Sequence, residues 1–264
     1  MKLQGCSALV TGASAGIGRE FARQLAPKAR VLVLVARRRD RLEELRAELT
    51  GRHPQLNVHV RAVDLSDEAQ LMALVEWLNA EKITVDLLIN NAGLGDIGPF
   101  ASSDPQRIRQ ILLVNIFALT MLTRRLLPGM IARKSGGILN VSSSAGFLPI
   151  AGFGVYAASK AYVTSLSEAL RAELIDSGIA VCALCPGPVE TEFGTVAQRM
   201  SESREPSPGF VRVPADEVAR AGLDGIEQGR ALVIPGAIMK IAMFLTRITP
   251  MPVLRAVSRL SARR

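Results

Sequence analysis

Short runs of aliphatic and β-branched residues alternate with longer amphipathic stretches from one end of the chain to the other. Because strands covered on both faces are apolar throughout, this pattern predicts a parallel sheet with helices on both sides, an α/β fold. The seven expected strands are residues 7–11, 31–36, 58–63, 85–90, 137–142, 179–184 and 231–235. The expected helices are residues 16–26, 40–50, 67–81, 104–130, 153–177 and 214–229.

No linker, repeat or low-complexity block divides this series, so residues 1–264 are expected to form a single domain. One long connection interrupts the alternation. Residues 186–214 hold five of the fourteen prolines and the polar run SESREPSPG. A connection of this length is typical of a lid over a substrate site, and a disordered insertion is the alternative.

The other interruption is residues 236–264, expected to form a basic, apolar C-terminal helical extension. Its apolar stretch contains Lys240 and Arg247 and is broken by Pro250 and Pro252, so a membrane-spanning helix is not expected. The extension is expected to fold back on its own domain or on a partner subunit. Peripheral contact with an anionic membrane surface is the alternative.

Composition narrows the classes of function. Lys and Arg exceed Asp and Glu by 32 to 24, and residues 231–264 supply six of the eight net charges. With only 4% aromatic residues and a nearly neutral body, nucleic-acid binding is not expected. Three cysteines and no signal-peptide pattern favour the cytoplasm. Cys182 and Cys185 lie in an apolar strand and are expected to be core thiols, and no metal site is expected.

The first expected strand leads directly into a glycine-rich turn, TGASAGIG at residues 11–18, and then into a helix. Glycines allow a tight turn and a close approach of the backbone to a pyrophosphate. The helix N-terminus offers free N–H groups and the positive end of the helix dipole. The turn therefore predicts a phosphate-binding site, although its spacing differs from the G-x-G-x-x-G pattern.

This turn resembles the cofactor motif of the short-chain dehydrogenase/reductases, and five further motifs follow in the order of that family. They are NNAG at 90–93, Asn115, NVSSS at 140–144, YAASK at 156–160 and PGPVET at 186–191. The resemblance covers about residues 5–235. It implies a Rossmann-like, doubly wound parallel sheet and a nicotinamide dinucleotide cofactor. By resemblance the cofactor contacts Gly12, Ser14, Gly16, Ile17, Gly18, Asp64, Asn91, Ala92, Gly93, Tyr156, Lys160, Pro186, Gly187, Val189 and Thr191.

The chemistry can also be argued from the residues. Tyr156 and Lys160 are four positions apart in an expected helix and therefore share one face. An ammonium beside a phenol is expected to lower the phenol's pKa, so that the pair can exchange a proton with a carbonyl or alcohol oxygen. Taken alone, the spacing of Tyr156 and Lys160 also fits two side chains on the protein surface with no role in proton transfer, which is the alternative.

By resemblance, Ser143 orients the reacting oxygen, and Ser142 is expected to point to the opposite face of the strand. Asn115 completes the catalytic tetrad by resemblance and supports a water relay to the lysine. A structural hydrogen bond is the alternative for this amide, because Asn115 lies in an apolar run.

Three arginines follow the second expected strand, where relatives that prefer NAD carry an acid. A guanidinium binds a 2′-phosphate through charge-assisted hydrogen bonds, so NADP(H) is the expected cofactor, with Arg37 as the first candidate and Arg38 as the second. A solvated helix start is the alternative for these arginines. Asp64 would contact adenine by resemblance, or cap the helix at 67–81.

The sequence therefore predicts an NADP(H)-dependent oxidoreductase that reduces a ketone, an aldehyde or a 3-oxoacyl group by hydride transfer, with Tyr156 as the general acid/base. The expected partner is a small, apolar carbonyl or alcohol substrate. A homodimer or homotetramer is implied by the resemblance. The alternatives are a non-catalytic NADP(H)-binding sensor and a membrane-docked scaffold.

Overall fold

The computed structural model describes residues 1–198, 212–250 and 252–255. Its centre is a seven-stranded, all-parallel sheet with the strand order β3-β2-β1-β4-β5-β6-β7. The strands are β1 (Ser7–Thr11), β2 (Val31–Ala36), β3 (Asn57–Ala62), β4 (Leu87–Asn90), β5 (Gly136–Val141), β6 (Ile179–Leu184) and β7 (Leu232–Val233). The predicted α/β fold with seven parallel strands is therefore confirmed.

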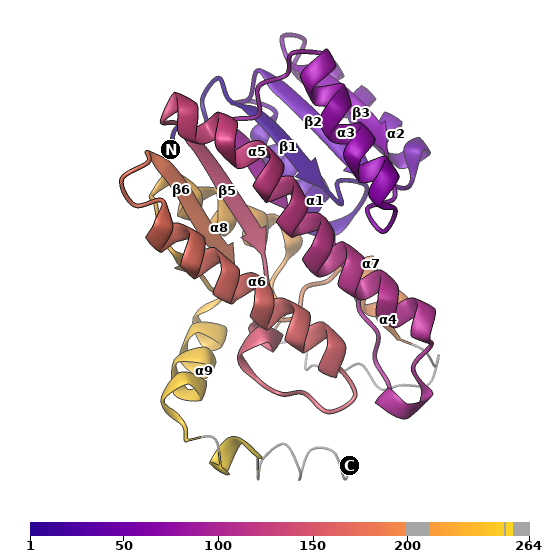
Figure 1. Ribbon diagram of the computed structural model, residues 1–264, viewed down its shortest axis with the longest axis vertical. Coiled ribbons are helices and arrows are strands. Elements are labelled where there is room, and N and C mark those ends of the chain that lie inside the picture. Colours follow the sequence, from indigo (N-terminus) through magenta and orange to yellow (C-terminus); the bar gives the residue numbers. More distant parts are fainter. Residues whose placement is uncertain (199–211, 251, 256–264) are drawn as a thin grey trace.

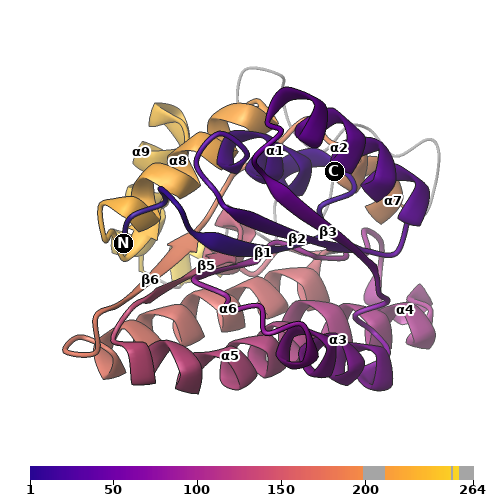
Figure 2. The ribbon, with the colours of Figure 1, turned by 90° about the horizontal axis from the view of Figure 1, so that it is seen from above.

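Helices cover both faces of the sheet (Figures 1 and 2). One layer contains α1 (Gly16–Leu25), α2 (Arg39–Arg52) and α8 (Ala215–Glu227). The other contains α3 (Glu68–Ala80), α4 (Pro105–Leu112), α5 (Leu119–Arg133) and α6 (Gly154–Glu173). The alternation of side chains along each strand produces this division. In β1, Val10 belongs to the apolar cluster beneath α1, and its neighbour Leu9 belongs to the cluster beneath α3 and α5.

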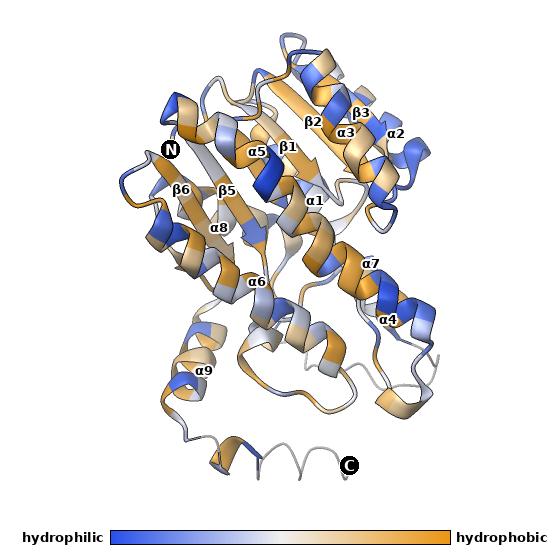
Figure 3. Cartoon of the chain, in the orientation of Figure 1, coloured by the Kyte–Doolittle hydropathy of each residue, from blue (hydrophilic) through white to orange (hydrophobic). Residues whose placement is uncertain are grey.

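The helix that contains Asn115 is continuous but not uniform. Residues Leu113–Ala118 form a π-helix, η2, between α4 and α5. The whole stretch Pro105–Arg133 is long and apolar enough to cross a membrane by length and composition. However, Val114, Ala118, Leu122 and Met130 lie in the core cluster against the sheet, so we interpret it as a sheet-covering helix. Figure 3 shows apolar residues along this helix and along the strands.

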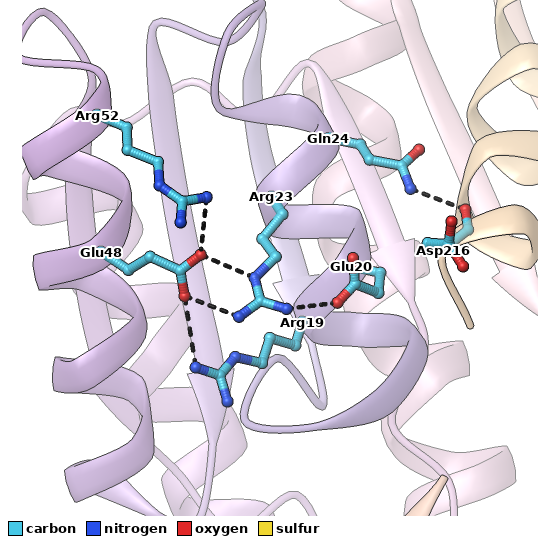
Figure 4. A network of polar contacts seen from close by, with 7 residues as sticks. All are labelled: Arg19, Glu20, Arg23, Gln24, Glu48, Arg52 and Asp216. Atoms are coloured by element: carbon cyan, nitrogen blue, oxygen red, sulfur yellow. Dashed lines mark hydrogen bonds and ion pairs between the residues drawn. The ribbon is translucent and has the colours of Figure 1, made fainter. Parts of the chain in front are cut away.

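A network of charged residues attaches α1 to its neighbours (Figure 4). The Glu48 carboxylate on α2 accepts hydrogen bonds from the Arg23 guanidinium at 2.8 and 2.9 Å, and the amide of Gln24 donates to the backbone oxygen of Asp216 at 2.8 Å. The first contact joins α1 to α2 and the second joins α1 to α8. The network therefore fixes α1, whose N-terminus follows the glycine-rich turn.

Two helices lie in the segments that interrupt the strand–helix alternation. The helix α7 (Glu192–Ala197) lies within the predicted lid, of which residues 199–211 are outside the described residues. The helix α9 (Ala237–Ile248) lies within the predicted extension, of which 251 and 256–264 are outside the described residues. The lid and the single-domain division stay predictions.

The α9 helix packs on the domain through only part of its surface. Met239 and Met243 are buried, and Met239 lies against Gly187. A second apolar set is more than half exposed, namely Ile238, Ile241, Phe244, Leu245 and Ile248. The expected folding back is thus seen for the two methionines, and the partner of the exposed set, subunit or membrane, stays a prediction.

Candidate active site

The glycine-rich turn places an uncapped helix N-terminus at the carboxyl edge of the sheet. Gly12 and Gly16 have φ angles of +68° and +52°, which favour glycine. The α1 helix begins at Gly16 after Ala15, which provides no side-chain cap, and its first turn has no acidic residue. Its first N–H groups therefore lack side-chain acceptors from the cap, and this arrangement fits the phosphates of a dinucleotide.

The loop after β4 is held against this turn by hydrogen bonds. Thr11 Oγ1 accepts from the backbone N–H groups of Asn91 and Ala92, both at 3.0 Å, and Asn91 Nδ2 donates to Thr11 O at 2.9 Å. A Cβ on Gly12 would lie 2.9 Å from Ala92 Cα. The motifs at 11–18 and 90–93 thus meet at one edge, as expected for the carboxyl ends of adjacent parallel strands.

Tyr156 lies in the first turn of α6 and is enclosed by aromatic rings. Only 8% of the residue is exposed, its ring stacks on Phe153 at a centroid distance of 4.3 Å, and Phe193 of α7 lies at 5.3 Å. A Cβ on Gly95 would lie 2.8 Å from the Phe193 ring and 3.3 Å from the Phe153 ring. The absence of a side chain at Gly95 therefore makes room for both rings.

This enclosure changes the expected acidity of the phenol. Burial raises the pKa of Tyr156 to about 12, and a side-chain hydrogen bond with Ser143 opposes this shift. The net shift of the Tyr156 pKa is therefore upward, opposite to the predicted lowering. Lys160 Nζ lies 5.6 Å from the centre of the phenol ring and donates its hydrogen bond to Val141 O at 2.8 Å. Tyr156 is thus a neutral phenol at neutral pH.

Lys160 and Asn115 are both buried beside Gly93. Asn115 Oδ1 accepts from Leu94 N at 2.8 Å, and its Nδ2 donates to Leu94 O at 2.9 Å and to Ser159 Oγ at 2.9 Å. A Cβ on Gly93 would lie 3.3 Å from Lys160 Nζ. The side chain of Asn115 therefore holds the loop after β4, and Gly93 allows that loop to approach the lysine.

The three serines after β5 have different surroundings. Ser143 Oγ accepts from Ala145 N at 3.1 Å, and Ser143 lies beside Tyr156, where it opposes the rise of the phenol's pKa. Ser142 Oγ donates to Lys160 O, a backbone oxygen of α6, at 2.7 Å, so its contact is structural. Ser144 begins a short 3₁₀ helix, η3 (Ser144–Phe147). Of the three, Ser143 is the serine placed beside the phenol.

The arginines after β2 divide into different environments. Arg38 Nη2 donates to Ser14 Oγ in the glycine-rich turn at 3.4 Å, and Arg38 Nη1 pairs with Glu192 at 2.8 Å. Arg37 is exposed, and within the described part of the chain it has no hydrogen bond or ion pair. Arg39 pairs with Glu43 on its own helix at 3.8 Å. The geometry favours Arg38 over Arg37 as the residue nearest the cofactor motif.

Asp64 and the helix cap after β3 are separate features. Asp64 Oδ1 accepts from Ser66 N at 2.9 Å and from Ser66 Oγ at 2.7 Å, in a local turn. The cap of α3 is Asp67, whose side chain accepts from Ala69 N and Gln70 N. The alternative that Asp64 caps this helix is therefore wrong, and its contact with adenine stays a prediction.

The PGPVET motif connects β6 to the site. Pro186 O accepts from Ser144 N at 2.8 Å, and Val189 bridges to Val213. Thr191 lies beside the glycine-rich turn, since a Cβ on Gly16 would lie 2.9 Å from its methyl carbon. Its hydroxyl also accepts from Phe193 N and so caps α7. The motif therefore joins the glycine-rich turn to the helix that covers Tyr156.

The sequence analysis missed Phe153, Phe193, Ser159 and Glu192. Ser159 lies inside the recognised YAASK run, and its hydroxyl accepts from Asn115 while donating to Tyr156 O at 2.7 Å. Phe153 and Phe193 belong to the few aromatic residues of the chain, and each lies within three residues of a recognised motif. Aromatic residues so close to the motifs were a usable signal for Phe153 and Phe193, and the position inside YAASK was one for Ser159; Glu192 gave none.

The three cysteines form no disulfide. Cys6, Cys182 and Cys185 are buried and unpaired, and burial raises the pKa of Cys182 to about 12. Among the described residues, no cluster of three or more His, Cys, Asp or Glu side chains could hold a metal ion. The expected role of Cys182 and Cys185 as core thiols agrees with their burial.

The buried lysine predicts a specific dependence of stability on pH. Burial lowers the pKa of Lys160 from 10.5 to about 8. Between these two values the folded protein has released the proton and the unfolded chain still binds it, so stability rises with pH. Below pH 8 the lysine is protonated in both the folded and the unfolded protein, so burial of the ammonium lowers the free energy of unfolding by its full amount.

Urea unfolding of the wild type and Lys160→Met at pH 7.5 and 9.5 measures this effect. We expect the unfolding free energy of the wild type to gain about 2 kcal/mol over that of the variant between the two pH values. A constant offset, from the lost hydrogen bond to Val141 O, is expected at both. Parallel pH profiles would show that the lysine is not a buried cation.

Comparison with known proteins agrees with this geometry. A sequence model of the short chain dehydrogenase family matches residues 7–202. A very-long-chain 3-oxoacyl-CoA reductase of Phaeosphaeria nodorum is 36% identical over 233 residues, which cover 83% of this chain and 65% of that protein. An NADP-dependent 3-hydroxy acid dehydrogenase of Escherichia coli K12 is 35% identical over 190 residues, covering 71% of this chain and 75% of that protein.

A solved structure of a short-chain dehydrogenase from Sphingobium yanoikuyae in complex with NADPH superimposes with a TM-score of 0.80. The two chains are 32% identical, and the match covers 93% of this chain and 96% of that one. The match to the family model extends over the glycine-rich turn, Tyr156 and Lys160. The chain therefore belongs to the short-chain dehydrogenase family.

Proposed function

We propose that this protein is an NADP(H)-dependent reductase of 3-oxoacyl substrates and related ketones. One observation carries the proposal: Tyr156 is buried beside Ser143 and lies one helical turn from a buried lysine. A neutral phenol is the protonation state that donates a proton to a carbonyl oxygen. The oxidoreductase class follows from family membership.

The cofactor, when bound, would supply the hydride for the carbonyl carbon. Ser143 would donate a hydrogen bond to the substrate oxygen, and Tyr156 would transfer its proton to that oxygen as charge develops. Lys160 would hold the ribose and stabilise the phenolate that remains, because its ammonium lies 5.6 Å from the ring. Asn115 would position the loop after β4 and, through Ser159, the first turn of α6.

The residues expected at the adenosine end of the cofactor favour NADP(H) over NAD(H). The guanidinium of Arg38 donates a hydrogen bond to the hydroxyl of Ser14, which lies in the turn that precedes the uncapped helix. A guanidinium binds a phosphate through paired charge-assisted hydrogen bonds, and a carboxylate at this position would repel it. One relative is named as NADP-dependent and one solved neighbour is in complex with NADPH, whereas two other neighbours are in complex with NAD or NADH.

The proposed substrate class has two sources of support. The relatives include a protein named as a very-long-chain 3-oxoacyl-CoA reductase and one named as a 3-hydroxy acid dehydrogenase, and a 3-oxo or 3-hydroxy acyl group is common to both. In this chain, exposed apolar side chains follow β4, β5 and β6, at Phe100, Ile150 and Val196. An apolar acyl chain fits such surroundings.

NADPH oxidation with a panel of 3-oxoacyl-CoA thioesters, aldehydes and diketones tests the proposal. We expect the 3-oxoacyl thioesters to give the highest kcat/KM, and longer acyl chains to lower KM because they bury more apolar surface. NADPH binding without turnover on any carbonyl of the panel would contradict the proposal. That result would favour a cofactor-binding sensor.

A further inference from the structure

Glu192, the first residue of α7, makes ion pairs with two arginines of the cofactor region. Its carboxylate pairs with Arg38 Nη1 at 2.8 Å and with the guanidinium of Arg41. The other amino group of Arg38 donates to Ser14 Oγ at 3.4 Å. One guanidinium therefore contacts both the glycine-rich turn and a carboxylate from a segment more than 150 residues away.

The position of this carboxylate matters because of what Arg38 is expected to bind. A carboxylate and a phosphate monoester both present oxygens that accept paired hydrogen bonds from a guanidinium. Glu192 is ionised at neutral pH, since hydrogen bonds from Arg41 and Arg38 lower its pKa to about 2. The arginine charge near Ser14 is thus already satisfied by an anionic group of the protein.

The same short helix also covers the catalytic end. Phe193, next to Glu192, lies 5.3 Å from the Tyr156 ring, and Ala197 O accepts from Ile97 N at 2.8 Å. Arg107 adds hydrogen bonds from α4 to Gly95 O at 2.7 and 3.1 Å, behind the two aromatic rings. The first turn of α7 thus contacts the arginines through Glu192 and lies beside Tyr156 through Phe193.

We propose that Glu192 takes the place of the cofactor's 2′-phosphate on Arg38 and Arg41 and holds α7 closed over Tyr156 until NADP(H) displaces it. This inference rests on the proposed preference for NADP(H). It assigns to Glu192 a role as a competitor for the phosphate and as the link between the adenosine end and the helix that covers the phenol. NAD(H), which lacks the phosphate, does not displace the carboxylate.

Isothermal titration with two fragments of the cofactor tests this competition. Adenosine 2′,5′-bisphosphate carries the 2′-phosphate, 5′-AMP lacks it, and neither carries the nicotinamide, so contacts near Tyr156 do not contribute. The variants are Glu192→Gln and the matched control Glu190→Gln. Glu190 lies two residues earlier and pairs at 3.9 Å with Arg212, away from Arg38 and Arg41.

Because exposed ion pairs are weak, removing the competitor is expected to give a moderate gain. We expect Glu192→Gln to bind adenosine 2′,5′-bisphosphate about three- to tenfold more tightly than the wild type, with the affinity for 5′-AMP unchanged. Glu190→Gln is expected to match the wild type for both. Unchanged or weaker binding of the bisphosphate by Glu192→Gln would overturn the proposal.

Hydrogen exchange of the α7 amides provides a second readout. In the wild type, exchange is expected to rise when the bisphosphate is added, and in Glu192→Gln it is expected to be high without ligand. If the exchange of the α7 amides changes neither with the ligand nor with the substitution, Glu192 does not hold α7 closed. If the wild type binds the bisphosphate and 5′-AMP equally, the preference for NADP(H) itself fails, and the proposal about Glu192 fails with it.

Discussion

Replacing Tyr156 with phenylalanine is expected to lower the kcat for NADPH-dependent carbonyl reduction by about 10²- to 10⁴-fold, the usual contribution of a general acid. The ring remains stacked on Phe153 and beside Phe193, so the fold and the affinity for NADPH are expected to persist. Steady-state kinetics gives kcat, and quenching of protein fluorescence gives the Kd for NADPH.

The chain offers a matched control because it has only one other tyrosine. Tyr162 lies about one and two-thirds turns further along α6, is 37% exposed, and its hydroxyl lies 3.0 Å from Thr120 Oγ1. Tyr162→Phe loses a hydroxyl of the same kind outside the site and is expected to keep the wild-type kcat. Equal activity of Tyr156→Phe and Tyr162→Phe would remove Tyr156 from the chemistry.

Replacing Arg38 with alanine is expected to raise the Kd for NADPH by about 10- to 150-fold and to leave the Kd for NADH nearly unchanged. This range corresponds to the loss of about 1.5–3 kcal/mol for hydrogen bonds to a charged group. Because the variant also loses the ion pair with Glu192, the change in the ratio of the two Kd values is the informative quantity.

Arg39→Ala is the matched control for this substitution. Its side chain is 77% exposed and pairs with Glu43 within α2, so the same charge is removed at the neighbouring position without the contact to Ser14. Arg39→Ala is expected to change the Kd for NADPH by far less. If the two variants weaken NADPH binding equally, the effect is one of overall charge, and Arg38 is not the phosphate ligand.

Much of the scaffold could be predicted because it depends on patterns that are local in the sequence. The strand at 31–36 is apolar throughout, as a strand covered on both faces must be, and its predicted bounds agree with the structure. The order of the motifs along the chain also predicted which of them meet, since the carboxyl ends of parallel strands lie at one edge. Thr11, Asn91 and Gly12 show this meeting.

Other features depend on tertiary contacts that no local pattern contains. The π-helix around Asn115 cannot be distinguished from an α-helix by apolar spacing, and it places the amide of Asn115 against the loop at Leu94. The acidity of Tyr156 depends on burial between two phenylalanines, one of them 37 residues away in the short helix α7. Helical spacing indicated a neighbouring ammonium and gave no information on desolvation.

The choice among the arginines shows the same limit. In RRRDRLEEL all three consecutive guanidinium groups are plausible ligands, because the sequence gives no direction for the side chains. In the structure Arg39 begins α2 and pairs along that helix, whereas Arg38 precedes the helix and contacts Ser14. The backbone at the strand–helix junction, and not the residue type, selects the arginine nearest the cofactor motif.

The most direct test is a crystal structure of the protein with NADPH bound. We expect the hydroxyl of Tyr156 to face the nicotinamide ring and the 2′-phosphate to contact the guanidinium of Arg38. A hydroxyl directed away from the ring, or a 2′-phosphate remote from Arg38, would contradict this expectation.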